Sequence, residues 1–149
     1  MSELLRVENL KVHFPVSASA NDKLFSFEKK VLKAVDGVSF TMEKGEVVAL
    51  VGESGCGKST VGKALVSLVS KTDGKVYYEG ADVSDKKSMA GLRKNVQYIF
   101  QDPYSSLNPR MTVKTILSRP MEVFGLHKDP QDREKRLSEL MKQDRKSVV

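Results

Sequence analysis

The sequence predicts an α/β domain in which antiparallel strands come first, strand–loop–helix units follow and helices end the chain. Three observations support this fold class. Residues 4–14 and 38–42 alternate apolar and polar side chains, as half-exposed antiparallel strands do. Residues 47–51 and 96–100 are largely apolar runs, which are typical of buried parallel strands. Residues 52–60 form a glycine-rich loop that leads into a helical pattern.

Local signals place the boundaries of the elements. Pro15 ends the first strand and is followed by a long polar loop over 15–30. Asp36-Gly37 predicts a turn between two short strands, Thr112 a helix N-cap, and Gly125 a helix end. The expected strands cover 4–14, 31–35, 38–42, 47–51, 75–79 and 96–100, and the expected helices run from the loop to Val69, over 87–94, from Thr112 to Phe124 and over 131–142.

Composition limits the class of protein. The 149 residues suffice for one modest domain with a core, and the net charge is +6. We find no RNA- or DNA-binding motif, so we expect the basic surface to accompany polyphosphate chemistry and not nucleic acid. No apolar run approaches the ~20 residues that span a bilayer, and the single Cys56 excludes an internal disulfide. We therefore expect a cytoplasmic protein whose membrane role comes through partners.

The glycine-rich loop fits the phosphate-binding pattern G-x-x-x-x-G-K-[ST]. It consists of Gly52, Glu53, Ser54, Gly55, Cys56, Gly57, Lys58, Ser59 and Thr60. Glycines let successive backbone N–H groups point at an anion, and the start of the following helix adds its positive dipole end. Lys58 can reach the outer phosphates, Ser59 can offer a hydroxyl to Mg²⁺, and Thr60 can contact an inner phosphate. The pattern predicts a nucleoside triphosphate site.

Two further residues could belong to this site. Gln101 directly follows the apolar run 96–100, and ligands of α/β sheets bind at such strand ends. Its amide could contact Mg²⁺ or a water near the γ-phosphate, or it could simply be a polar strand cap. Phe14 ends the first strand and could stack on an adenine ring, although taken alone core packing is the better explanation of an aromatic residue there.

Taken together, the chain resembles the ATP-binding subunits of ABC transporters. The resemblance runs from about Leu4 to about Leu140 and includes Phe14, the segment 35–40 before the loop, the loop itself and Gln101, which matches the family's Q-loop glutamine. It implies a P-loop NTPase of the ABC type, with an antiparallel β subdomain and a parallel-sheet core. It also implies that Lys58 and Gln101 are catalytic, and that Ser59 and Gln101 hold Mg²⁺ beside ATP.

Residues 101–113 and the long loop 15–30 are similar to the oligopeptide and dipeptide importer branch, and to its F-type subunit. The resemblance implies a second, different ATP-binding subunit, two permease subunits and an external solute-binding protein. The chain would then lie on the inner face of the plasma membrane, held by the permeases. Nickel importers share much of the pattern, so another solute stays open, as does a non-transport ABC ATPase. A small-molecule kinase would explain the glycine-rich loop but not residues 101–113.

The family's signature motif Leu-Ser-Gly-Gly-Gln does not occur, and no apolar run ending in Asp-Glu follows Gln101. His13 and His127 lie in the wrong places for the switch histidine, and His127 is expected at the surface. We expect residues 4–142 to form the N-terminal part of an ABC ATP-binding domain that ends within the helical subdomain, and residues 143–149 to be a non-native tail. Such a piece should bind a nucleotide without hydrolysing it, and should aggregate through exposed strands.

Overall fold

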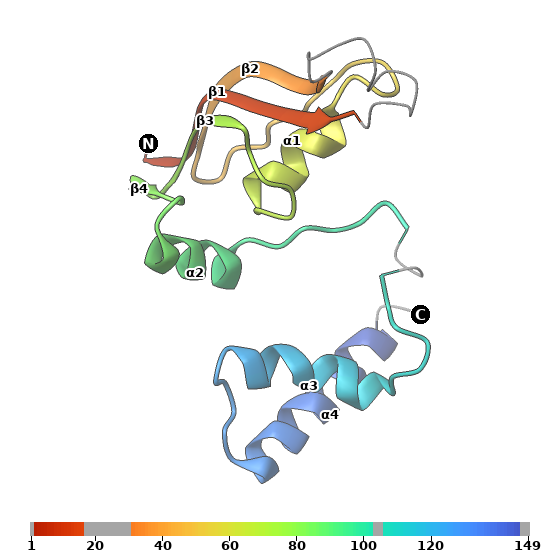
Figure 1. The fold of residues 1–149 in the computed structure, drawn as a ribbon. Helices are drawn as coiled ribbons and strands as arrows, with labels where there is room; N and C mark the ends of the chain where they lie inside the picture. The colour runs from red at the N-terminus through yellow and green to blue at the C-terminus, as the bar shows by residue number, and fades with distance from the viewer. Residues whose placement is uncertain (1, 17–30, 103–105, 147–149) are drawn as a thin grey trace. The chain divides into compact units, whose positions relative to one another are not determined.

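A computed structural model describes residues 2–16, 31–102 and 106–146. The chain forms two compact units, Met1–Tyr98 and Ile99–Val149, and each is described by itself. The first unit holds the strands β1 (Glu3–Pro15), β2 (Val31–Glu43), β3 (Asp73–Tyr78) and β4 (Ala81–Asp82), with the helices α1 (Lys58–Leu65) and α2 (Lys86–Asn95) (Figure 1). The loop predicted over 15–30 lies mostly outside the described residues.

The strands form one antiparallel sheet in the order β2-β1-β3-β4. This arrangement confirms the prediction that antiparallel strands begin the chain. Val7, Leu10 and Val12 of β1 face inward and are at most 1% exposed, because a register shift between Val7 and Leu10 returns the strand to the same face. They pack with Val61 and Ala64 of α1, so the sheet and this helix share one hydrophobic core. The core therefore anchors the helix that follows the glycine-rich loop.

The predicted turn at Asp36-Gly37 is wrong, because β2 runs through it as one strand of 13 residues. Gly37 has a φ of 90° and stands opposite no residue of β1, since Leu10 pairs with Val38 and Lys11 with Asp36. The dipeptide thus forms a β-bulge, in which glycine also supplies the left-handed backbone. Turns and β-bulges of this kind favour the same residues, because both need a residue with a positive φ and glycine adopts it readily.

Helix α1 is shorter than expected, since it ends at Leu65 and not near Val69. Ser67 takes a φ of 56°, and its N–H donates to the Ala64 carbonyl while that of Leu68 donates to Lys63. These two bonds form the Schellman motif that commonly ends a helix. Helix α2 confirms the short basic helix, and the Asp85 carboxylate caps it by accepting from the N–H groups of Lys87 and Ser88.

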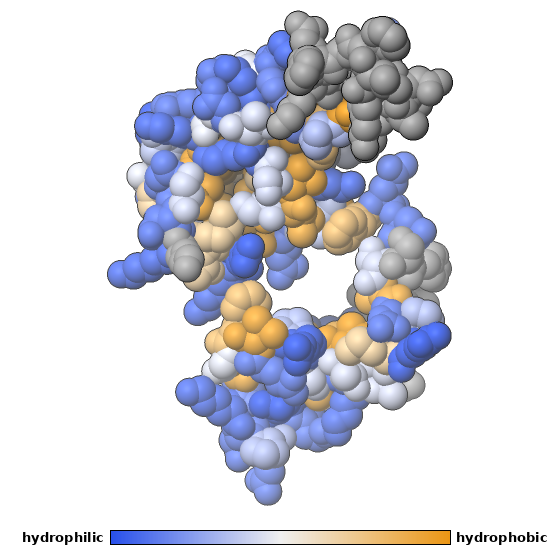
Figure 2. All heavy atoms as spheres, in the orientation of Figure 1, coloured by the Kyte–Doolittle hydropathy of each residue, from blue (hydrophilic) through white to orange (hydrophobic). Residues whose placement is uncertain are grey.

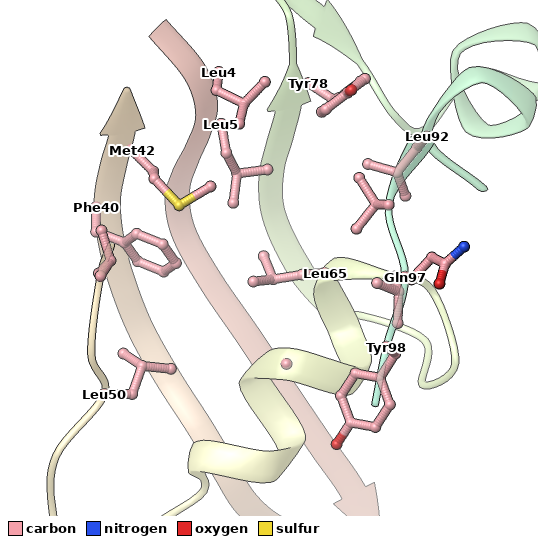
Figure 3. Close-up of a pocket in the computed structure, with 14 residues that line it drawn as sticks. Leu4, Leu5, Phe40, Met42, Leu50, Leu65, Tyr78, Leu92, Gln97 and Tyr98 are labelled. Carbon is pink, nitrogen blue, oxygen red and sulfur yellow. The ribbon is translucent and has the colours of Figure 1, made fainter. Parts of the chain in front are cut away.

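The two apolar runs predicted as buried parallel strands are largely exposed and belong to no β-ladder in the described residues. Val47 and Val51 are 94% and 93% exposed, and Ile99 is 89% exposed. Val48, Leu50, Val96 and Tyr98 instead line an apolar groove of about 280 Å³ over the core. Figure 3 shows Leu50 and Tyr98 at this groove with Leu5, Phe40 and Leu65. The side chains of these segments thus alternate in direction as those of strands do.

The second unit contains α3 (Val113–Val123) and α4 (Pro130–Lys146). The predicted cap of α3 is confirmed, because the Thr112 hydroxyl accepts the Thr115 N–H at 3.2 Å. Gly125, with a φ of 65°, lies just beyond the end of α3, also as predicted. The buried Met121 and Leu137 belong to α3 and α4 respectively, and an ion pair joins Lys114 to Glu134.

His127 lies between these helices and its Nδ1 is 2.6 Å from an Asp132 carboxylate oxygen. Its side chain is 34% exposed, so the expected surface position of His127 is close to what the structure shows. Figure 2 shows apolar side chains at the surface among the hydrophilic ones, in keeping with the exposed runs described above. Among the described residues, no helix is long and apolar enough to cross a membrane.

Candidate functional site

The glycine-rich loop joins the extended segment 47–51 to α1. Gly55 and Gly57 have φ values of 81° and 99°, which L-residues rarely adopt. The Cys56 N–H donates to the Glu53 carbonyl at 3.3 Å, and the Val61 N–H donates to Gly57 at 2.9 Å. The loop therefore curls back on itself and passes directly into the helix, with Gly57 as its N-cap residue. This is the conformation that a phosphate-binding loop requires.

Gly57 also contacts a distant part of the chain. A methyl group built on it would lie 2.2 Å from the carbonyl oxygen of Ala34 in β2. Ala34 is half-buried and directly precedes the core residue Val35. Glycine is thus required at position 57 for two reasons, its backbone conformation and the close approach of another backbone.

The Lys58 ammonium lies over the loop. Its Nζ donates to the carbonyl oxygens of Gly52 at 2.8 Å and Glu53 at 2.6 Å, and lies 3.4 Å from the Cys56 sulfur. The cation stands beside the helix N-terminus, whose N–H groups add further positive potential. The loop is therefore an electropositive concavity suited to an anion.

Ser59 and Thr60 occupy the first turn of α1 beside Lys58. The Ser59 side chain is exposed, so its hydroxyl can reach a ligand, and hard oxygen donors of this kind suit Mg²⁺. Thr60 is half-buried. Among the described residues, no group of three or more His, Cys, Asp or Glu side chains could hold a metal by itself.

Phe14 lies at the end of β1 and pairs with Leu32 of β2, two residues before the Ala34 that meets the loop. Its side chain is 38% exposed, which rules out the alternative that it packs in the core. A planar apolar ring thus stands open to solvent in the unit that carries the loop. A groove of about 370 Å³ runs between residues 33–38 of β2 and residues 56–58 of the loop.

Comparison with known proteins identifies the family. The ABC transporter family matches residues 35–149. The chain belongs to the ABC transporter family. The chain is 38% identical over 143 residues to the oligopeptide transport ATP-binding protein AppF of Bacillus subtilis, covering 93% of this chain and 41% of that one.

Two other relatives of this ABC chain carry similar names. It is 45% identical to the oligopeptide transport ATP-binding protein OppF of Lactococcus lactis (95% of this chain, 43% of that one). It is 43% identical to the dipeptide transport ATP-binding protein DppF of Escherichia coli (93% of this chain, 41% of that one). The chain thus spans about two fifths of the length of the curated relatives it matches.

Solved structures confirm the ABC fold. The dimeric ATP-binding cassette MJ0796, bound to ADP and phosphate, matches with a TM-score of 0.68 at 22% identity, over 93% of this chain and 56% of that one. An ATP-binding subunit of an ABC transporter matches with a TM-score of 0.62 at 26% identity, over 93% and 49%. The predicted fold class, an α/β P-loop NTPase of the ABC type, is therefore confirmed.

Gln101 is the predicted ABC site residue that lies in the unit without the loop. It belongs to the second unit, is exposed, and follows an extended segment that is not the buried strand expected there. Part of the family-like stretch after it, Pro103–Ser105, lies outside the described residues. Its role beside the nucleotide stays a prediction.

Sequence reasoning missed the contact between the loop and β2. The side chain of Ala34 is a methyl group without a functional group, and no local sequence pattern marks this residue as a neighbour of Gly57. It also missed the charges beside it: the Asp36 carboxylate lies 3.0 Å from His13 Nε2 and 3.1 Å from Lys33 Nζ. The hydrogen bond from the Lys33 ammonium, and to a smaller extent the one with His13, lowers the pKa of Asp36 below its usual value. Cross-strand register, which exists only in the folded chain, would have been the signal.

Proposed function

We propose that this chain is the nucleotide-binding part of an ABC importer that couples ATP hydrolysis to the uptake of oligopeptides or dipeptides. The observation that supports it most is the Lys58 ammonium held over the curled loop at the start of α1. The names of three relatives as oligopeptide or dipeptide transport proteins support peptides over nickel.

In this proposal each site residue binds a different part of ATP. Backbone N–H groups of residues 52–60 surround the β- and γ-phosphates, and Lys58 exchanges its two carbonyl partners for phosphate oxygens. Phe14 stacks on the adenine, while Thr60 contacts an inner phosphate. Ser59 and Gln101 would hold Mg²⁺, which would supply positive charge beside the phosphates.

The proposed partners follow from the same assignment. A second, different ATP-binding subunit would face the loop, and two permease subunits would hold the pair at the inner face of the plasma membrane. A solute-binding protein would deliver the peptide from outside. We expect genes for two permeases and a solute-binding protein beside this gene. A neighbourhood with no permease gene would favour a non-transport ABC ATPase instead.

Binding of a fluorescent ATP analogue to the 149-residue chain tests the nucleotide site. Lys58→Ala should weaken binding at least about tenfold, because charge-assisted bonds to phosphate are the strong ones. Lys63→Ala removes the same charge from the last turn of the same helix and should leave the affinity within about twofold. Equal affinities of the two variants would exclude Lys58 as a phosphate ligand.

The role of Phe14 has its own test with a matched control. Stacking of a base on an aromatic ring is worth about 1–3 kcal/mol, so Phe14→Ala should weaken ATP binding about fivefold or more. Leu32→Ala alters the exposed apolar partner across the strand pair and should change affinity much less. If both variants bind ATP like the parent chain, Phe14 does not hold the base.

A further inference from the structure

Strand β2 contains a second β-bulge, and its extra residue is the one that meets the loop. Val12 pairs with Val35, but the next residue of β1, His13, pairs with Lys33. Ala34 therefore has no partner across the ladder. Bulges of this kind bend a strand and re-aim its backbone, and they are common beside functional sites.

The re-aimed backbone lies against the nucleotide loop. The Ala34 carbonyl oxygen is 2.2 Å from the position that a methyl group on Gly57 would take. Gly57 directly precedes Lys58 and is the N-cap residue of α1. The position of the bulge thus limits where Gly57, and with it the first N–H groups of the helix, can lie.

The Asp36 carboxylate, two residues beyond the bulge, contacts Lys33 and His13. Asp36 accepts from Lys33 through one oxygen at 3.1 Å, and its other oxygen lies 3.0 Å from His13 Nε2. In a regular strand, residues three apart point to opposite faces of the sheet. The extra residue Ala34 brings Lys33 and Asp36 to one face, so their ion pair exists only while the bulge does. We call His13, Lys33 and Asp36 the carboxylate clip.

We propose that the carboxylate clip holds the bulge at Ala34 against Gly57, and that Asp36 is thereby a positioning residue of the nucleotide-binding loop. The clip spans the bulge along β2 through Lys33 and ties it across the ladder to β1 through His13. The part of the inference that concerns affinity rests on the proposed ATP site, whereas the part that concerns loop geometry does not.

The same sheet supplies a matched control. Lys11 and Asp73 form an ion pair of 3.2 Å between β1 and β3, and neither residue is among those that line the groove beside the loop. Both carboxylates are partly exposed, at 44% for Asp36 and 62% for Asp73. Asp36→Asn and Asp73→Asn therefore remove comparable surface pairs, and only the first removes the clip.

The sign of the effect on ATP affinity separates positioning from simple electrostatics. Loss of a negative charge near a polyphosphate site should tighten binding if charge alone matters. If the clip positions the loop, Asp36→Asn should weaken binding of the fluorescent ATP analogue about two- to fivefold, the range that exposed ion pairs support. Asp73→Asn should leave it unchanged. Unchanged or tighter binding by Asp36→Asn, or equal weakening by both variants, overturns the proposal.

Cys56 reports on the loop without any nucleotide. It is exposed, and it is the only cysteine in the chain. At about 0.15 M salt, where the screening length is near 8 Å, Asp36→Asn and Lys33→Met should both raise the iodoacetamide labelling rate of Cys56 about twofold or more, whereas an effect of charge alone would shift the rate in opposite directions. Asp73→Asn should not change this rate. Opposite shifts in the two clip variants, or none, refute the clip even if the parent chain binds no ATP. Absence of binding with the labelling pattern intact would overturn the proposed function alone.

Discussion

Alanine should be much less tolerated at Gly57 than at Gly55, although both residues have a positive φ. An L-residue in the left-handed region costs about 1–2 kcal/mol at either position. At Gly57 the added methyl would also lie 2.2 Å from the Ala34 carbonyl oxygen, whereas at Gly55 it meets nothing within 4 Å. Relief of such an overlap costs about 1–3 kcal/mol. We therefore expect Gly57→Ala to lose about 2–5 kcal/mol of unfolding free energy.

Urea denaturation followed by circular dichroism measures this difference. Gly45→Ala is a second reference, because Gly45 has a φ of 81° and open space around it but lies outside the loop. Gly45→Ala and Gly55→Ala should lose similar amounts, about 1–2 kcal/mol each. If Gly57→Ala loses no more than these two, to within about 0.5 kcal/mol, the contact with Ala34 does not constrain the loop.

Four further outcomes are expected. Leu10→Ala should destabilise the first unit by about 2–5 kcal/mol in urea denaturation, because Leu10 is fully buried; a loss below about 1 kcal/mol would mean that the site is not packed. Labelling Cys56 with a maleimide should block binding of the ATP analogue, and unchanged binding would separate this thiol from the site. Hydrogen bonds lower the pKa values of Asp36, Asp73 and Asp82 in the folded chain, so the unfolded chain binds more protons in acid. The urea midpoint of unfolding should therefore fall as the pH drops below about 4. A urea midpoint that rises in acid would contradict this. Val47→Lys and Val51→Lys should reduce aggregation of the purified chain, measured by light scattering, because these apolar side chains are more than nine-tenths exposed. Unchanged scattering would show that the chains do not aggregate through these two residues.

Elements that depend on local chemistry were predictable from the sequence. The Thr112 cap and the Gly125 break bound α3 as expected, because a capping hydroxyl and a left-handed glycine act within a few residues. The exposed apolar runs 47–51 and 96–100 were not, because a strand needs a neighbour and the sequence pattern records only the tendency to be extended. Their alternation is present, whereas the ladder is absent from the described residues.

The candidate site divides in the same way. The curl of the loop and the place of Lys58 at the helix start follow from nine consecutive residues. Ala34 and Gly57 lie 23 residues apart in the sequence, and no sequence pattern predicts their contact. Phe14 shows both limits, since its place at the end of a strand was predictable but its exposure was not.

The bulge at Ala34 is best explained by the loop and not by the sheet. Val35 faces the core while Lys33 and Asp36 share the other face, so the alternation would be regular if Ala34 were absent. The sheet therefore loses a ladder pairing at this residue and gains nothing in its own pattern. What the extra residue adds is a carbonyl against Gly57, at the start of the helix that carries Lys58. A strand of the antiparallel sheet thus departs from regular geometry where it supports the phosphate-binding loop.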